Sequence, residues 1–190
     1  LGEVLFFRGF FGMVFYFFII PRERMKNFYI TNRPGLHFLR CLFGIIALIA
    51  IFIALRNLPL ATVVSISFAT PIFTTIFSII FLSEKVGLYR WLAVLVGFVG
   101  IIVITQPGLN TLNIYYIFPI IFCLGLSYVA IAIRQLSSTE PVWLISFYFS
   151  LTITIVSLFT LPFGWVMPNL KNLFLLSLIG VFGGVANLWL

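Results

Sequence analysis

Hydroxyl side chains recur through one apolar segment of the sequence, SISFATPIFTTIFSIIFLSEK, at residues 65–85. Because this segment is rich in Ile and Phe, it belongs in an apolar environment, where each hydroxyl needs a hydrogen-bond partner. At about 100° per residue, a subset recurs at spacings of three and four and so shares one helix face. The subset is Ser67, Thr70, Pro71, Thr74 and Ser78. Such a face could line a passage for a polar solute, with Pro71 freeing a carbonyl, or could bond its own carbonyls and pack on another helix.

Three further side chains could bind a solute at membrane depth. The amide of Asn187 is costly in hydrocarbon, more so than a hydroxyl. Trp189 and Tyr128 could stack on a flat or cationic ligand group, although aromatic residues in such helices also serve packing. We therefore predict a substrate-binding set that consists of Ser67, Thr70, Pro71, Thr74, Ser78, Tyr128, Asn187 and Trp189.

Charged residues near the ends of apolar segments form a second, gating or structural set: Arg8, Arg40 and Glu84. Both arginines are expected to extend along the helix until the charge reaches the interface, a behaviour called snorkelling. Glu84 could cap the next helix or pair with a basic loop residue. His37, the one histidine, is expected in a solvated loop.

The chemistry of an enzyme is missing from the sequence. It contains no Asp and no HExxH or GxSxG motif, which argues against an intramembrane enzyme. Cys41 and Cys123 lie far apart in apolar runs, which favours two buried hydrophobic residues over a disulfide or a metal site. We expect no cofactor. No ATP-binding motif is present either, so any driving force for transport would be a gradient or an exchanged solute.

The composition shows which solvent surrounds these residues. The chain has 190 residues, of which 63% are apolar and 8% charged, with a mean hydropathy of +1.24. A soluble domain carries roughly 25% charged residues, so most of this chain faces lipid. Seven segments are long enough, or nearly so, to cross a bilayer as helices. They are residues 4–20, 36–55, 59–82, 87–106, 113–133, 142–163 and 173–190.

The basic residues predict the orientation of these spans. Eight of the eleven fall on one side, five of them between residues 22 and 40, which makes the 21–35 loop cytoplasmic by the positive-inside rule. The spacings Ala93–Gly97 and Gly180–Gly184 are typical of helix contacts.

The sequence also contains a weak internal repeat. GEVLFFRGFF near the start is echoed by TEPVWLISFYF at 139–149, and LHFLRCLFG at 36–44 by a run ending in LFLLSLIG at 173–180. Both echoes have an offset of about 136–137 residues, across five spans, so the second copy would be inverted in the membrane. Inverted repeats are typical of secondary transporters. The alternative is that generic apolar helices resemble one another.

The run LRNLPLATVVSISFATPIFTTIFSIIFLSEKVGLYRWLAVLVGFVGIIVITQPG, residues 55–108, resembles the fourth and fifth spans of EamA-type transporters in the drug/metabolite transporter superfamily. The features that carry the resemblance are NLPLA, the mid-span Pro71, the SEK turn at 83–85 and the Gly97–Gly100 helix. EVLFFRGFFG and PGLHFLRCLFG are similar to the second span and to the start of the third.

The resemblance implies an all-α polytopic membrane protein, a helical bundle of two inverted five-helix repeats. This chain would hold about seven of the ten spans, numbers two to eight. Residues 1–108 would form the first repeat without its first span, and residues 109–190 the second without its last two.

The expected function is a secondary transporter that moves a small amino-acid-like, drug-like or nucleoside-like metabolite across the bacterial inner membrane by alternating access. PGLHFLRCLFG and FATPIFTT are also similar to members that carry S-adenosylmethionine. The expected partners are the lipid bilayer, the small-molecule substrate and a second copy in a homodimer, with no nucleic acid. Because the chain opens at Leu1 and closes on VANLWL inside an apolar run, a non-functional truncated remnant is the alternative.

Overall fold

The computed structural model describes residues 2–19, 31–105, 114–163, 165 and 168–188. The described part consists of helices and contains no strand. The longer helices are α1 (Gly2–Ile19), α2 (Pro34–Asn57), α5 (Leu88–Thr105), α6 (Ile117–Ser137), α7 (Val142–Leu158) and α8 (Leu170–Leu188). Between α2 and α5 lie α3 (Leu60–Ser67) and α4 (Thr70–Leu82), and short 3-10 turns occur at Ile114–Tyr116 and Leu161–Phe163. The predicted all-helical class is confirmed.

Helix boundaries follow from local sequence signals. α2 begins with Pro34, since proline lacks the N–H that a first helical turn leaves unpaired. It ends at Asn57, whose side chain donates to the carbonyl of Ile53 over 2.8 Å, just before Pro59. Ser83 ends α4 in the left-handed conformation, with φ 52°, and starts the predicted SEK turn.

Four stretches are long and apolar enough to cross a membrane, by length and composition: Gly2–Ile19, Pro34–Asn57, Leu60–Leu82 and Ile114–Ser137. Shorter apolar stretches of 10–17 residues lie in α5, α7 and α8. Every segment predicted to span the membrane thus corresponds to a helix or, for 59–82, to the pair α3–α4. The chain is a multi-pass membrane protein.

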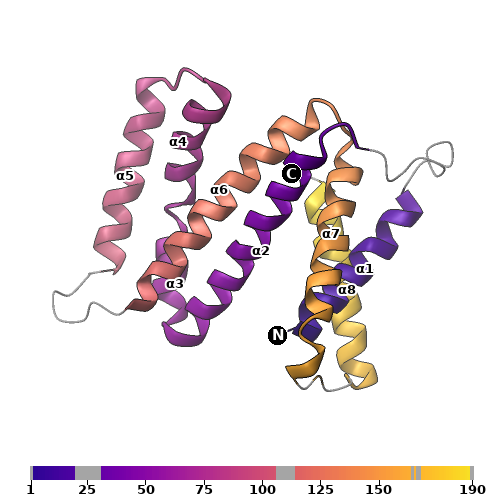
Figure 1. The fold of residues 1–190 in the computed structure, drawn as a ribbon. Coiled ribbons are helices and arrows are strands. Elements are labelled where there is room, and N and C mark those ends of the chain that lie inside the picture. The colour runs from indigo at the N-terminus through magenta and orange to yellow at the C-terminus, as the bar shows by residue number, and fades with distance from the viewer. Residues whose placement is uncertain (1, 20–30, 106–113, 164, 166–167, 189–190) are drawn as a thin grey trace. The chain divides into compact units, whose positions relative to one another are not determined.

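The chain folds into two compact units. One consists of residues 1–41 and 135–190, the other of residues 42–134. In the first unit, α1 packs against both α7 and α8 (Figure 1).

Glycines allow this close packing of α1. A Cβ atom at Gly9 would lie 2.9 Å from the carbonyl oxygen of Ser150 in α7. On the other side, a Cβ atom at Gly180 of α8 would lie 3.2 Å from the carbonyl oxygen of Arg8. The hydroxyl of Tyr16 donates a hydrogen bond of 3.0 Å to the carbonyl of Gly184. The predicted helix contact at Gly180–Gly184 is confirmed.

In the second unit, α6 packs against the last part of α2 and against α3–α4. Gly125 of α6 is buried against Ala47 and the carbonyl of Phe43. Ala54, Leu58 and Val63 form a small buried cluster where α2 turns into α3. α5 contacts α3 and α4. A Cβ atom at Gly97 of α5 would have no described atom within 4 Å, so among the described residues the contact predicted at Ala93–Gly97 does not involve Gly97.

Candidate substrate-binding and gating residues

The hydroxyls of α3 and α4 are satisfied mainly by their own helices. Ser67 donates to the carbonyl of Val63 over 2.8 Å, Thr74 to that of Thr70 over 2.9 Å, and Ser78 to that of Thr75 over 2.9 Å. Such bonds let a hydroxyl sit in an apolar environment without a substrate. They also leave each oxygen able to accept a further hydrogen bond.

Pro71 coincides with an interruption of the helix. α3 ends at Ser67 and α4 starts at Thr70, with Pro71 in its first turn. Since proline has no N–H, the carbonyl of Ser67 lacks its usual helical donor. The hydroxyl of Thr70 supplies one instead, over 2.7 Å, and the thiol of Cys123 lies 3.8 Å from the same oxygen. The predicted freeing of a carbonyl next to Pro71 is therefore seen, although side chains of the protein occupy it.

Ser127 of α6 links this break to the neighbouring helix. Its side chain is fully buried and donates to the carbonyl of Thr70 over 3.0 Å. The hydroxyl of Thr74 lies 3.0 Å from that of Ser127, and its single hydrogen is directed either to Ser127 or to the carbonyl of Thr70. Next to Ser127 in the same helix, Tyr128 packs between the rings of Phe43 and Phe81, with centroid distances of 4.3 and 5.8 Å. The structure therefore brings Thr70, Thr74 and Ser127 together and places Tyr128 nearby in sequence on α6.

The side chains of two predicted binding residues, Asn187 and Trp189, are not among those that the structure describes. Trp189 lies outside the described residues. Asn187 lies in α8, but its side chain is not among those described.

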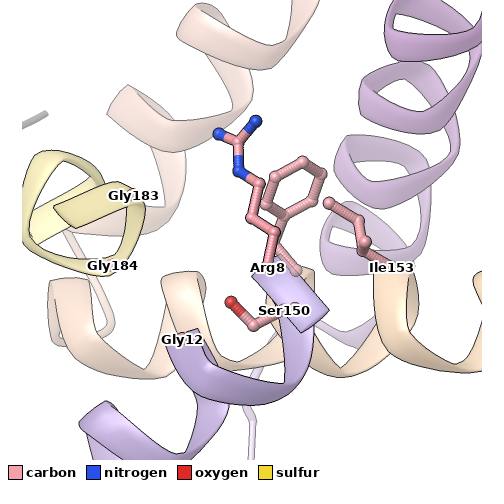
Figure 2. A pocket seen from close by; sticks show the side chains of 8 residues that line it. Arg8, Gly12, Ser150, Ile153, Gly183 and Gly184 are labelled. Carbon is pink, nitrogen blue, oxygen red and sulfur yellow. The ribbon is translucent and has the colours of Figure 1, made fainter. Parts of the chain in front are cut away.

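Arg8 lies at a cavity inside the first unit. The cavity is lined by Arg8, Gly9 and Gly12 of α1, Phe149, Ser150 and Ile153 of α7, and Gly183 and Gly184 of α8. Figure 2 shows the Arg8 side chain extending past Ser150 and Gly12, with Gly183 on the neighbouring helix. A Cβ atom at Gly183 would lie 3.3 Å from Nε of Arg8, so the glycine leaves room for the guanidinium group. The cavity volume is about 10 Å³, enough for a single water molecule.

Arg40 is buried against α7. It lies in the second turn of α2 and is only 2% exposed. The guanidinium carbon lies 4.4 Å from the ring centroid of Phe149, a cation–π contact. The expectation that Arg40 snorkels to the interface is therefore wrong, because packing on α7 holds the charge inside the protein.

His37 is also buried, at 3% exposure, within α2. Its Nε2 atom bonds the carboxylate of Glu140, and its ring packs on Tyr148 with centroids 4.7 Å apart. The expectation of a solvated loop histidine is wrong, since the helix starts at Pro34 and carries His37 to a partner just before α7.

Glu140, in the turn between α6 and α7, accepts hydrogen bonds from several groups. Besides His37, the hydroxyl of Thr31 donates to it, and so do the backbone N–H groups of Asn32, over 2.8 Å, and Arg33, over 3.3 Å. Burial by itself raises the pKa of Glu140, but the bonds from Thr31, His37 and the Asn32 N–H outweigh it, so the pKa lies below its usual 4.5. The carboxylate is thus ionised at neutral pH and fastens residues 31–33 to the start of α7.

Glu84 pairs with Arg134 over 2.5 Å. The expected pairing of Glu84 with a basic residue is seen, although Arg134 lies near the end of α6 and not in a loop. The pair joins the SEK turn to the end of α6, which places both ends on the same side of the second unit. No group of three or more His, Cys, Asp or Glu side chains that could hold a metal occurs in the described part of the chain.

Sequence reasoning missed a second series of hydroxyls, on α7. Ser146, Ser150, Thr154 and Ser157 recur at spacings of four, four and three, and all are buried. The same periodicity that singled out residues 67–78 would have found them. Thr154 donates to the carbonyl of Ser150 over 2.8 Å, and Ser150 lines the Arg8 cavity.

Comparison of the chain with known proteins identifies its family. The profile of the EamA-like transporter family matches residues 2–106, more than half of the chain. A protein of Rickettsia bellii (strain RML369-C) named S-adenosylmethionine uptake transporter is 29% identical over 184 residues, which cover 96% of this chain and 62% of the relative. A riboflavin transporter of Vibrio cholerae is 31% identical over 151 residues, or 79% of this chain and 50% of the relative.

A pseudopaline exporter of Pseudomonas aeruginosa is 26% identical over 193 residues, or 100% of this chain and 66% of the relative. No solved structure matches the chain. The chain spans less than two thirds of the length of the S-adenosylmethionine transporters that it matches. The matched region covers α1 to α5, with the Pro71 break and the SEK turn, and on this ground the chain belongs to the EamA-like transporter family.

Proposed function

We propose that the protein is a secondary transporter that carries a small organic metabolite across the bacterial inner membrane by alternating access. It would do so as two inverted repeats, with residues 1–108 in the first and 109–190 in the second, and with the 21–35 loop in the cytoplasm. Family membership supports transport as the activity. The buried polar groups of α2 and α7, which face protein instead of lipid, support a polar solute.

S-adenosylmethionine is the first candidate substrate. The observation that carries this choice is the alignment of nearly the whole chain with four rickettsial relatives of that name. Riboflavin and pseudopaline, named for other relatives, are the competing candidates.

The substrate passage is proposed to run along α3–α4, where the helix is interrupted. The hydroxyls of Thr70 and Thr74 and the carbonyl of Ser67 lie at the break, next to Ser127 of α6. An interrupted helix at membrane depth is a common way to present backbone carbonyls to a transported solute.

Uptake of radiolabelled S-adenosylmethionine by cells that express the full reading frame tests the proposal. We expect accumulation above vector-only cells that unlabelled S-adenosylmethionine suppresses and riboflavin does not. Thr74→Phe should abolish this uptake, whereas Ile80→Phe, at a residue 63% exposed on the same helix, should leave it intact. Unchanged uptake by Thr74→Phe would place the passage elsewhere. A protein that inserts at normal levels and carries none of the three solutes would favour a non-functional remnant.

A further inference from the structure

Arg40 carries a charge that the described residues leave uncompensated. Its Nε and Nη1 atoms are buried and have no hydrogen-bond partner among them. The neighbouring polar groups are the Cys41 thiol and the Tyr16 phenol, and no carboxylate pairs with Arg40 in the described part of the chain. An arginine cannot discard its proton to escape this situation. The contact with the Phe149 ring offsets only part of the cost of burial.

A second guanidinium approaches the same part of α7. Arg8 of α1 lines the small cavity together with Phe149, the residue on which Arg40 packs. Tyr16, which lies near Arg40, is bonded to the carbonyl of Gly184 in the wall of that cavity. Phe149 of α7 thus contacts Arg40 of α2 and lines the same cavity as Arg8 of α1, and neither arginine has an ion-pair partner among the described residues.

We propose that Arg40, with Arg8 as the second cation, binds the carboxylate of the transported molecule. The inference rests on the proposed function and narrows its substrate class to amino-acid-like solutes. The guanidinium group of an arginine donates charge-assisted hydrogen bonds to carboxylate oxygens, and the unpaired Nε and Nη1 of Arg40 are donors still open to such an acceptor. The cavity that Arg8 and Phe149 line admits a group the size of one water molecule, so one carboxylate oxygen fits beside Arg8 while a whole metabolite does not. The rest of the solute would lie where the helices separate during transport.

The first test uses the unmodified protein and competitors that differ in one group. Uptake of labelled S-adenosylmethionine is measured against S-adenosylhomocysteine, which keeps the carboxylate, and decarboxylated S-adenosylmethionine, which lacks it. We expect the decarboxylated compound to compete at least tenfold more weakly than S-adenosylmethionine itself, and S-adenosylhomocysteine to retain competition. Equal competition by the decarboxylated compound would overturn the proposal.

The second test changes the residue. Arg40→Met should raise KM at least tenfold, and Arg40→Lys, which keeps the charge but loses the planar guanidinium group and its several donors, should fall between it and the wild type. Arg56→Met is the matched control, because Arg56 is exposed at the other end of the same helix. An unchanged KM in Arg40→Met would contradict a substrate-binding role. So would an equal rise in KM in Arg56→Met.

If the wild-type protein takes up no S-adenosylmethionine, the proposed substrate is wrong, and the carboxylate-binding role of Arg40 and Arg8 is tested separately. The thermal stability of the purified protein is then measured with a panel of amino acids and their carboxamides. Stabilisation by one or more acids, absent with the matching amides and lost in Arg40→Met, would uphold the site with another substrate. Stabilisation by no acid, or by phosphatidylglycerol alone, would overturn it. The unliganded Arg40→Met protein should melt higher than the wild type, because it no longer buries an unpaired charge.

Discussion

His37 and Glu140 form a buried hydrogen bond between an imidazole and a carboxylate that are 103 residues apart in the sequence. Their side chains are only 4% and 3% exposed. Because an ionised carboxylate only accepts hydrogen bonds, Nε2 of His37 must carry the hydrogen. The bond, together with those from Thr31 and Asn32, connects the start of α2 to the start of α7.

The first prediction concerns this connection. Glu140→Gln should lower the free energy of unfolding by about 1.5–3 kcal/mol, because it removes the charge from a carboxylate that accepts four bonds. Thermal or denaturant unfolding of the purified protein in detergent measures the loss. Glu84→Gln is the control: its partner Arg134 is 60% exposed, so that pair should contribute only about 0–1 kcal/mol. Equal losses in the two variants would show that burial of Glu140 has no effect on stability.

The second prediction is a pH dependence with a fixed sign. The pKa of Glu140 is lower in the folded protein than its usual 4.5, so the folded state binds this proton less well than the unfolded state does. The stability due to Glu140 is therefore complete above pH 4.5 and is lost as the pH falls through the folded pKa.

Melting temperatures of the wild type and Glu140→Gln, measured from pH 7 downwards, check this. The gap between the two proteins should be constant above about pH 4.5 and should close below it. The other titratable groups beside Glu140, His37 and Tyr148, are present in both proteins. A gap that widens in acid would contradict the lowered pKa.

The spans themselves could be predicted from the sequence because long apolar runs have few alternatives to a membrane helix. The break at Pro71 was predictable for an equally local reason, the missing N–H. The surroundings of His37 and Arg40 were not predictable from the sequence. Both residues lie near the start of α2, where an exposed position was the expectation, yet their partners Glu140 and Phe149 are more than 100 residues away.

The hydrogen bonds of the candidate site also fall into two groups, those that the sequence could predict and those that it could not. The hydrogen bonds of Ser67, Thr74 and Ser78 within their own helix follow from spacing and could be foreseen. The bond between Thr74 and Ser127 depends on which helices are neighbours, and one sequence does not contain that information. For glycines, spacing alone did not separate Gly180, which packs on α1, from Gly97, which packs on no described residue.

The third prediction uses this contrast between glycines. A Cβ atom at Gly180 would lie 2.6 Å from Cβ of Phe11 and 3.2 Å from a backbone oxygen, neither of which can swing away. Gly180→Ala should therefore cost about 1–3 kcal/mol through overpacking of α1 on α8. Gly97→Ala should be neutral or stabilising, by up to about 1 kcal/mol, because alanine favours the helix. Thermal unfolding of both variants measures the difference, and equal melting temperatures would contradict the packing of α1.

The fourth prediction concerns orientation in the membrane. Arg56→Cys and Lys85→Cys place thiols at exposed residues that the positive-inside rule puts on opposite sides. In intact cells, a membrane-impermeant thiol reagent should label position 56 and leave position 85 unlabelled. Background labelling should be small, because Cys41 and Cys123 are 4% and 0% exposed. Both positions should react after the cells are permeabilised, and labelling of position 85 alone in intact cells would reverse the orientation.

The packing of α1 also has a consequence for how the protein is made. Its partners α7 and α8 begin at Val142 and Leu170, so they leave the ribosome long after α1 does. At about 5–20 residues per second, α1 waits roughly 6–25 s in the membrane before the first of them arrives. During that interval Arg8 and the glycines of α1 have neither of the helices that cover them in the finished structure. The early part of the chain is thus most vulnerable to membrane proteases and most in need of an insertase or chaperone before its last helices are synthesised.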